Sequence, residues 1–327
     1  MLESFIYSFN SVMPIVLLVL FGMLLRKINF LKDDFCTIAD KLVFNVALPM
    51  ELIRSVGTTD FKTIFAKENM RVTVFFFFAI IVAFIFCCIG VKFFLKENSQ
   101  RGVFIQGAIR GNYAIFALPL AFNMFGESGR VSASMVLPII IIMYNFLTVI
   151  AFSIYAPRAE DKKGPLDIIV QIAKSTAKNP MILAIAVALL MSFTESKIGI
   201  TVPNFIMEAI GDVAALAVPL SLISIGVNFD PKRLKNGLGI AFWCMIAKNI
   251  ALPAFALTVG ILMGFRGIPL TLILLSLGGP TAVSSYIMAK NLHGDAELAS
   301  KILLLSTICS LGTMFGFIFI LKQFAFI

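Results

Sequence analysis

The chain has 327 residues, of which 59% are hydrophobic and 14% charged, and its mean hydropathy is +0.97. Soluble globular domains have about 45–50% apolar and about 25% charged residues, so this composition excludes an ordinary soluble domain and indicates a polytopic membrane protein. The net charge of +9 comes without a basic, aromatic-rich face or a nucleic-acid motif, and it therefore indicates cytoplasmic loops rather than a nucleic-acid partner.

Ten segments are long and apolar enough to cross a bilayer, which takes about 20 residues. In chain order they lie near residues 8–28, 36–56, 72–95, 102–124, 130–154, 179–195, 203–227, 237–264, 268–290 and 298–321. The first segment follows Glu3 and precedes Arg26 and Lys27. A signal peptide carries its positive charge first, so we expect a first membrane helix with its N-terminus outside.

A polar interval over residues 156–178 predicts a cytoplasmic linker between a five-helix repeat, 1–155, and a second one, 179–327. The loops after the first, third, fifth, seventh and ninth segments carry 17 Lys and Arg residues, whereas the other loops and the termini carry 8. The richer loops should be cytoplasmic. Both termini should then lie outside the plasma membrane, which we expect to be a bacterial inner membrane.

The two halves also match in sequence. At an offset of 170, the second and seventh segments share seven identities in 24 positions, among them Pro49 with Pro219 and Asp60 with Asp230. At an offset of 168, Gly111 falls on Gly279. Because each half has five segments, the second half must enter the membrane from the opposite side. Inverted repeats of this kind are typical of transporters.

The fourth and ninth segments contain helix-breaking residues at matching places, which are Gly111 with Asn112 and Gly279 with Pro280. We expect two discontinuous helices that meet inside the membrane, where protein or water receives their unpaired backbone groups. Half-helix N-termini favour anions. Arg110 and Lys248 are the basic residues left inside segments, so we expect the cavity to attract carboxylates.

Four motifs in this order resemble the auxin efflux carrier family, which includes plant auxin exporters and bacterial malonate or malate carriers. They are LVFNVALPMELIRSVGTTDF (42–61), IRGNYAIFALPLAFNMFGE (109–127), VPLSLISIGVNFD (218–230) and IAKNIALPAF (246–255). The linker is short, as in the bacterial members, so we do not expect auxin as the substrate.

The resemblance implies ten helices, with helices 1, 2, 6 and 7 as a dimer-forming scaffold and helices 3–5 and 8–10 as a transport domain. Substrate would bind beside the crossing of broken helices 4 and 9, and access would alternate by an elevator-like movement. The family's Asn and Pro in helix 4 carry over to Asn112 and Pro119. Its helix 9 often has a proline near the position of Ser284 and Ser285, whereas this chain has Pro280.

The candidate substrate site therefore combines charged, polar and helix-breaking residues from three segments. They are Arg110, Gly111, Asn112, Tyr113, Pro119, Lys248, Gly279, Pro280, Thr281, Ser284 and Ser285. The alternative for Arg110 is a structural counter-ion or a side chain that snorkels to the surface. Lys248 either holds substrate or takes the place of a sodium ion. Glu208 and Asp212 share a helix face and either carry a coupled proton or form ion pairs, Asp212 with Lys248.

These features favour a secondary carrier for mono- or dicarboxylates such as malate or malonate, driven by the substrate gradient or by coupled protons or sodium. A cation/proton antiporter should have paired acids at the crossing, but segments 102–124 and 268–290 contain no Asp or Glu. A membrane enzyme is a further alternative, but no nucleophile–base pair, metal-ligand spacing or nucleotide loop in the sequence supports it. We expect no cofactor or metal. A receptor that binds the ligand without moving it remains an alternative.

Overall fold

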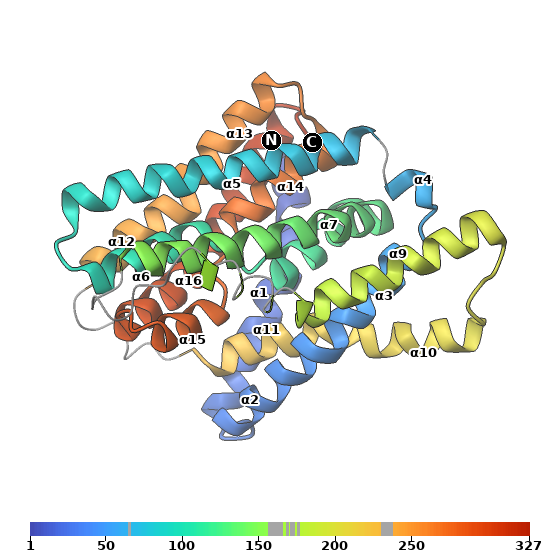
Figure 1. The fold of residues 1–327 in the computed structure, drawn as a ribbon, viewed down its shortest axis with the longest axis horizontal. Helices are drawn as coiled ribbons and strands as arrows, with labels where there is room; N and C mark the ends of the chain where they lie inside the picture. Colours follow the sequence, from blue (N-terminus) through green and yellow to red (C-terminus); the bar gives the residue numbers. More distant parts are fainter. Residues whose placement is uncertain (65–66, 156–165, 168–169, 171–173, 175–176, 230–237) are drawn as a thin grey trace.

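A computed structural model describes the chain except for residues 65–66, 156–165, 168–169, 171–173, 175–176 and 230–237 (Figure 1). The described residues form helices and contain no strand, which confirms the predicted all-helical class. Most of the predicted linker, 156–178, lies outside the described residues, as do Asp230 and Lys232 of the repeat match.

The helices pack as two groups. In the first group α1 packs on α11, α11 on α2, and α3 on both α9 and α10. Figure 1 shows α3, α9 and α10 reaching out together on one side of the molecule. The bounds in this group are α1 Leu2–Lys27, α2 Asp33–Leu42, a π-helical turn η1 Val43–Ala47, α3 Leu48–Gly57, α9 Pro180–Ile198, α10 Asn204–Ala215 and α11 Ala217–Val227.

The second group holds α5–α7 and α12–α16, with α14 packed on α13 and α7, and α12 on α16. A short helix, α4 Phe61–Ile64, leads into it. The bounds are α5 Lys67–Phe94, α6 Asn98–Ile109, α7 Tyr113–Ile154, α12 Gly239–Ile246, a π-helical turn η4 Ala247–Ala251, α13 Leu252–Leu262, α14 Gly267–Gly278, α15 Ser284–Asn291 and α16 Ala296–Gln323. Contacts of α1 with α7 and α16, and of α3 and α11 with α7, join the groups.

Seven helical stretches of the described chain are long and apolar enough to cross a membrane. They include α1, α5, α7, α9 and α16, together with the joined stretches Asn204–Val227 and Gly239–Leu262. The predicted segment 102–124 is divided between α6 and α7, and 268–290 between α14 and α15. The division into ten spans and the inverted repeat therefore stay predictions.

Two π-helical turns widen long helices just before a proline. In η1 and η4 the turn is followed by Leu48-Pro49 and Leu252-Pro253. A proline inside a helix lacks an N–H and its ring crowds the carbonyl four residues earlier. A π turn absorbs that conflict locally. The turn at η4 matters for the site, because it holds Lys248.

Glycines set two other features of the packing. At Gly126 the backbone of α7 turns with φ 63° and ψ −145°, between the predicted segments 102–124 and 130–154. A side chain is strongly disfavoured at this φ. Where α1 crosses α11, Cβ atoms added to Gly22 or Gly226 would overlap the carbonyl groups of Ile223 or Val19. These glycines let the two backbones approach closely, as small residues do in membrane helix pairs.

Candidate functional site

The two helix interruptions lie against each other. Helix α6 ends at Ile109 and α7 begins at Tyr113, while α14 ends at Gly278 and α15 begins at Ser284. The extended residues between them pair as an antiparallel bridge between Gly111 and Thr281. The backbone N–H of Asn112 donates to the backbone carbonyl of Pro280 at 2.7 Å. The backbone N–H of Ala282 donates to the backbone carbonyl of Arg110 at 3.3 Å. Each interruption thus satisfies backbone groups of the other.

The close approach explains the glycine of the first interruption. A Cβ atom at Gly111 would lie 2.7 Å from the carbonyl oxygen of Ser276 and 3.2 Å from Nζ of Lys248. These distances are below or at the edge of van der Waals contact. The second interruption passes close to α6 in the same way, because Oγ1 of Thr281 donates to the carbonyl of Gly107 at 2.8 Å.

Side chains receive the carbonyl groups that α6 and α14 leave unpaired at their C-terminal ends. Lys248 donates from Nζ to the carbonyl of Ile109 at 3.3 Å, and Asn249 donates from Nδ2 to that of Gly278 at 3.1 Å. The hydroxyl of Tyr144 donates to the carbonyl of Ser276 at 2.9 Å. A helix C-terminus carries partial negative charge, so the ammonium of Lys248 is favourably placed. Lys248 is fully buried and lies behind the bridge.

A cavity of about 260 Å³, which we call the arginine cavity, lies beside the bridge. Its polar lining comes from Asn45, Arg110, Asn112, Tyr113, Tyr144, Asn145, Asn179 and Ser284. Arg110 donates from Nη2 to Oγ of Ser284 at 3.1 Å and from Nη1 to Sδ of Met288 at 3.0 Å. None of the described lining residues is acidic, so the guanidinium faces this cavity with neutral partners.

A second cavity of about 380 Å³ lies elsewhere along the bridge and shares Asn112 with the first. One wall comes from α1, α2 and α11 and includes Asp40 and Ser224; the other comes from α15, α16 and the interruptions and includes Thr281 and Tyr286. Asn112 therefore lies where both cavities reach the bridge. We call this space the second cavity.

A family model described as a membrane transport protein matches residues 7–318. The chain belongs to this family of membrane transport proteins, the auxin efflux carrier family. The resemblance seen in the sequence is confirmed, and the chain is a multi-pass membrane protein with a transport role rather than an enzyme.

Relatives of similar length support this membership. An uncharacterized transporter of Methanocaldococcus jannaschii is 23% identical over 92% of this chain and 95% of its own length. An uncharacterized transporter of Escherichia coli is 26% identical over 91% of this chain and 94% of its own length. An uncharacterized transporter of Methanothermobacter thermautotrophicus is 21% identical over 95% of this chain and 97% of its own length. The alignments span nearly the whole of each protein, so the family fold covers both halves of the chain.

In this family member the structure brings together part of the predicted site. Arg110, Gly111, Asn112, Tyr113 and Ser284 line the arginine cavity, and Asn112 and Thr281 line the second cavity. The other predicted residues lie outside both linings. Gly279, Pro280 and Ser285 are buried at the second interruption, Pro119 is buried within α7, and Lys248 lies behind the bridge.

The predicted coupling acids lie elsewhere. Glu208 and Asp212 are exposed on α10, which packs against α3, whereas Lys248 is fully buried in η4. No ion pair joins Asp212 to Lys248 within the described part of the chain. A role for these acids in coupling stays a prediction.

Four of the polar residues that the sequence interpretation missed are Asn45, Tyr144, Asn145 and Asn249, and Asn179 of the arginine cavity was missed as well. A usable signal was present for Asn45, Asn145 and Asn249, because each interrupts an apolar segment. Asn249 directly follows Lys248, and Asn45 stands in the matching sequence before Ala-Leu-Pro. Tyr144 gives no comparable signal, since a tyrosine in an apolar segment usually serves packing.

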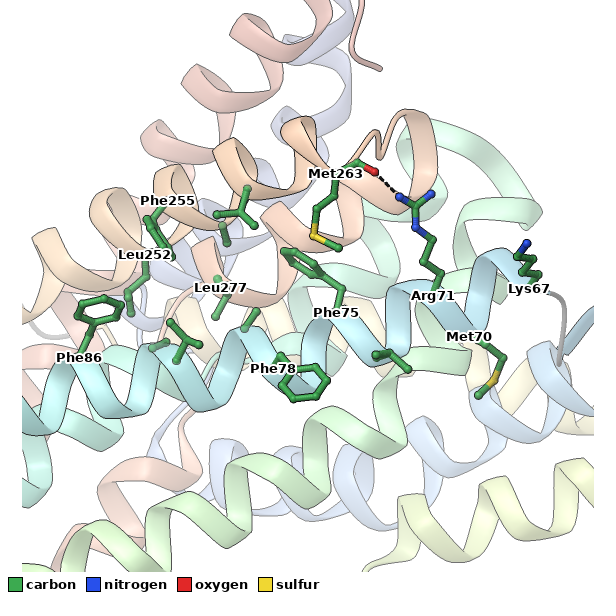
Figure 2. Close-up of a pocket in the computed structure, with 16 residues that line it drawn as sticks. Lys67, Met70, Arg71, Phe75, Phe78, Phe86, Leu252, Phe255, Met263 and Leu277 are labelled. Atoms are coloured by element: carbon green, nitrogen blue, oxygen red, sulfur yellow. Dashed lines mark hydrogen bonds between the residues drawn. The ribbon is translucent and has the colours of Figure 1, made fainter.

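A larger hollow of about 580 Å³ lies between α5 and α13, away from the interruptions (Figure 2). Its lining is apolar, with Phe75, Phe78 and Phe255 among the side chains drawn. Lys67 and Arg71 lie at one end, where Arg71 donates to the carbonyl of Met263. The hollow contains none of the predicted site residues, and its lining resembles a surface that faces lipid.

Proposed function

We propose that this protein is a secondary carrier of small organic anions, mono- or dicarboxylates such as malate or malonate, and that the anion binds in the arginine cavity. The observation that carries the proposal is the guanidinium of Arg110. It lies in a cavity inside an apolar protein, and it donates hydrogen bonds to the neutral side chains of Ser284 and Met288. An intramembrane cation without an acidic neighbour in the described lining is well suited to a carboxylate.

The size and polarity of the cavity favour a small substrate. At about 260 Å³ it is smaller than the roughly 300–1,000 Å³ typical of sites for drug-sized ligands. Asn45, Asn112 and Asn145 supply amide groups around the guanidinium. One carboxylate would take two hydrogen bonds from Arg110, and these amides would bind the remaining oxygens.

The movement that we propose follows from the two helix groups. The α1, α2, α3, α9, α10 and α11 group would be the scaffold, and the group with α5–α7 and α12–α16 would carry the substrate in an elevator-like movement. The antiparallel pairing of the interruptions supports two inverted five-helix repeats and ten spans. The second cavity lies toward the C-terminal ends of α1 and α11. In the sequence, the segments that follow these two helices are rich in Lys and Arg. Under the predicted topology the second cavity opens to the cytoplasm.

We extend the proposal to the partners and the location. The carrier would lie in the plasma membrane with both termini outside and form a homodimer through the scaffold group. A proton or a sodium ion remains the candidate for coupling. A cation/proton antiporter is less well supported, because the described lining of the arginine cavity contains a base and no acid.

A thermal-shift series on purified protein tests the anion site. Malonate or malate should raise the melting temperature of the wild type by several degrees, because a ligand that binds only the folded state stabilises it. Arg110→Ala should abolish this shift, while Arg110→Lys should keep part of it, since a lysine acts as a point charge. Arg266→Gln removes a cation outside both cavities and should keep the full shift.

Two results would contradict the proposal: no carboxylate stabilises the wild type, or Arg110→Ala responds as the wild type does. Exchange of radiolabelled malonate in proteoliposomes then separates a carrier from a receptor. A receptor would show the thermal shift but no exchange above protein-free liposomes.

A further inference from the structure

Asp40 places a carboxyl group in the wall of the second cavity. It lies in the N-terminal half of the α2–η1–α3 stretch, and Oγ of Ser224 on α11 donates to its Oδ1 at 2.7 Å. The side chain is half-buried. Nothing in the proposed anion site requires an acid at this place, and the charge of Asp40 would not attract an anionic substrate.

The surroundings of Asp40 offer little to balance its charge. The other charged and titratable groups with described side chains on the elements around it are Glu3, Tyr7, Arg26 and Lys27 on α1, Asp34, Cys36 and Lys41 on α2, Tyr286 and Lys290 on α15, and Glu297, Lys301, Cys309 and Lys322 on α16. On α16 Lys301 pairs with Glu297, and α11 has no titratable group. Among the described residues, no basic side chain lies within salt-bridge distance of Asp40. Among the described groups, Ser224 donates the hydrogen bond to the carboxylate, and the cavity leaves room for water beside it.

The opposite wall carries no charge among its described lining residues. It presents five aliphatic side chains across the cavity from α1, α2 and α11, with hydroxyl groups of Tyr286, Ser300 and Thr307 among them; the aliphatic residues are Val283, Leu303, Leu304, Ile308 and Leu311. If this wall closes onto the first, water leaves and Asp40 must be buried against a mainly aliphatic, uncharged surface. Burying a lone carboxylate is far more costly than burying a neutral carboxylic acid that keeps one hydrogen bond. Closure should therefore require a proton on Asp40.

We propose that Asp40 is a proton-binding site that controls closure of the second cavity. The proton comes from the water in the cavity, binds the carboxylate, and returns to that water when the cavity reopens. Acid on this side would then speed the transport cycle without any net movement of protons. The inference rests on the proposed function in one respect, which is that the cavity closes during transport.

Cysteine labelling tests the proton site without any substrate. In a chain whose five native cysteines are replaced by serine or alanine, Ser300→Cys places a thiol in the second cavity. Thr58→Cys, at the exposed end of α3, reports how pH alone changes thiol reactivity. The ratio of the two labelling rates by a small methanethiosulfonate should fall about fivefold from pH 8 to pH 6, because protonation shifts the population toward the closed cavity.

Asp40→Asn mimics the protonated side chain and should give a low ratio at both pH values. Ser224→Ala keeps the carboxylate but removes its hydrogen-bond donor, so the midpoint of the pH response should move upward by about half a pH unit or more. This second variant decides the matter if Asp40→Asn does not fold. A ratio that ignores pH in the wild type, an unchanged pH response in Asp40→Asn, or an unchanged midpoint in Ser224→Ala would overturn the proposal.

Malonate exchange in proteoliposomes with equal pH on both sides separates this proposal from the anion site. Wild-type exchange should be several-fold faster at pH 6 than at pH 8, and exchange by Asp40→Asn should not depend on pH. Glu195→Gln, which changes an exposed acid on α9 outside both cavities, should keep the wild-type response. If labelling responds as expected but no carboxylate exchanges, the proton site stands and the anion proposal fails. If malonate exchanges but labelling ignores pH, the reverse holds.

Discussion

At the scale of single residues, Gly111 is the position where the site tolerates least change. Gly111→Ala would bring a Cβ atom to 2.7 Å from the carbonyl oxygen of Ser276 on α14. Overpacking of this kind costs about 1–3 kcal/mol, because backbone must shift on both sides of the bridge. We expect a lower melting temperature in detergent and a loss of malonate exchange.

Gly312→Ala is the matched control for this variant. A Cβ atom at Gly312 meets nothing within 4 Å, and alanine favours the interior of α16. Its melting temperature should stay at or slightly above that of the wild type. If the two variants behave alike, the tight fit at the bridge does not limit stability.

The sequence identified several residues of the site, but it could not assign a role to each of them. It identified Arg110 and Lys248 as intramembrane cations and Gly111 with Asn112 as a break, and the structure places Arg110 and Asn112 in one cavity. It could not separate the roles of the two cations, because that depends on which side of the bridge each side chain reaches. Lys248 is directed to a helix end, and this follows from the π turn at η4, for which the sequence offered only Pro253 as a signal.

At the scale of elements, the crossing of α1 and α11 depends on two glycines. Gly226→Leu would place a large side chain where the carbonyl of Val19 now lies, so the helices would have to separate. We expect a melting temperature lower by roughly 5 °C or more, since a few kcal/mol is a large share of the stability of a folded chain. Gly316→Leu, at an open position of α16, should leave the melting temperature nearly unchanged.

Helix boundaries were predicted well where the sequence carries punctuation. Gly111, Gly126 and Gly279 each lie at or near an observed bend or break. The packing partners of each helix were beyond the reach of hydropathy, because most of these helices are apolar on every side. Only the exposed and buried faces in the structure show that α1 meets α11 and that α3 meets α9.

At the scale of the whole molecule, a hydroxyl pair joins the two helix groups. Oγ of Ser55 on α3 donates to Oγ of Ser134 on α7 at 2.8 Å. Cysteines at both positions should form a disulfide on mild oxidation, because the side-chain atoms already lie close together. If the groups move relative to each other, this bond should stop malonate exchange, and a reducing agent should restore it.

The single variants Ser55→Cys and Ser134→Cys control for the substitutions themselves and should keep their exchange after oxidation. Full exchange by the completely cross-linked protein would rule out movement of α3 past α7. The repeat match in the sequence relates one half of the chain to the other. It gives no information on this contact, because Ser55 and Ser134 both lie in the first half.

The position of Lys248 and Asn249 has a mechanical consequence. The two residues are consecutive in one turn of η4, and each holds the end of a different half-helix, Lys248 that of α6 and Asn249 that of α14. Because both side chains come from the same turn, a displacement of η4 would pull both helix ends in the same direction. The paired interruptions could then move as one rigid unit, and a bound ligand would move with them while the hydrogen bonds of the site stay intact.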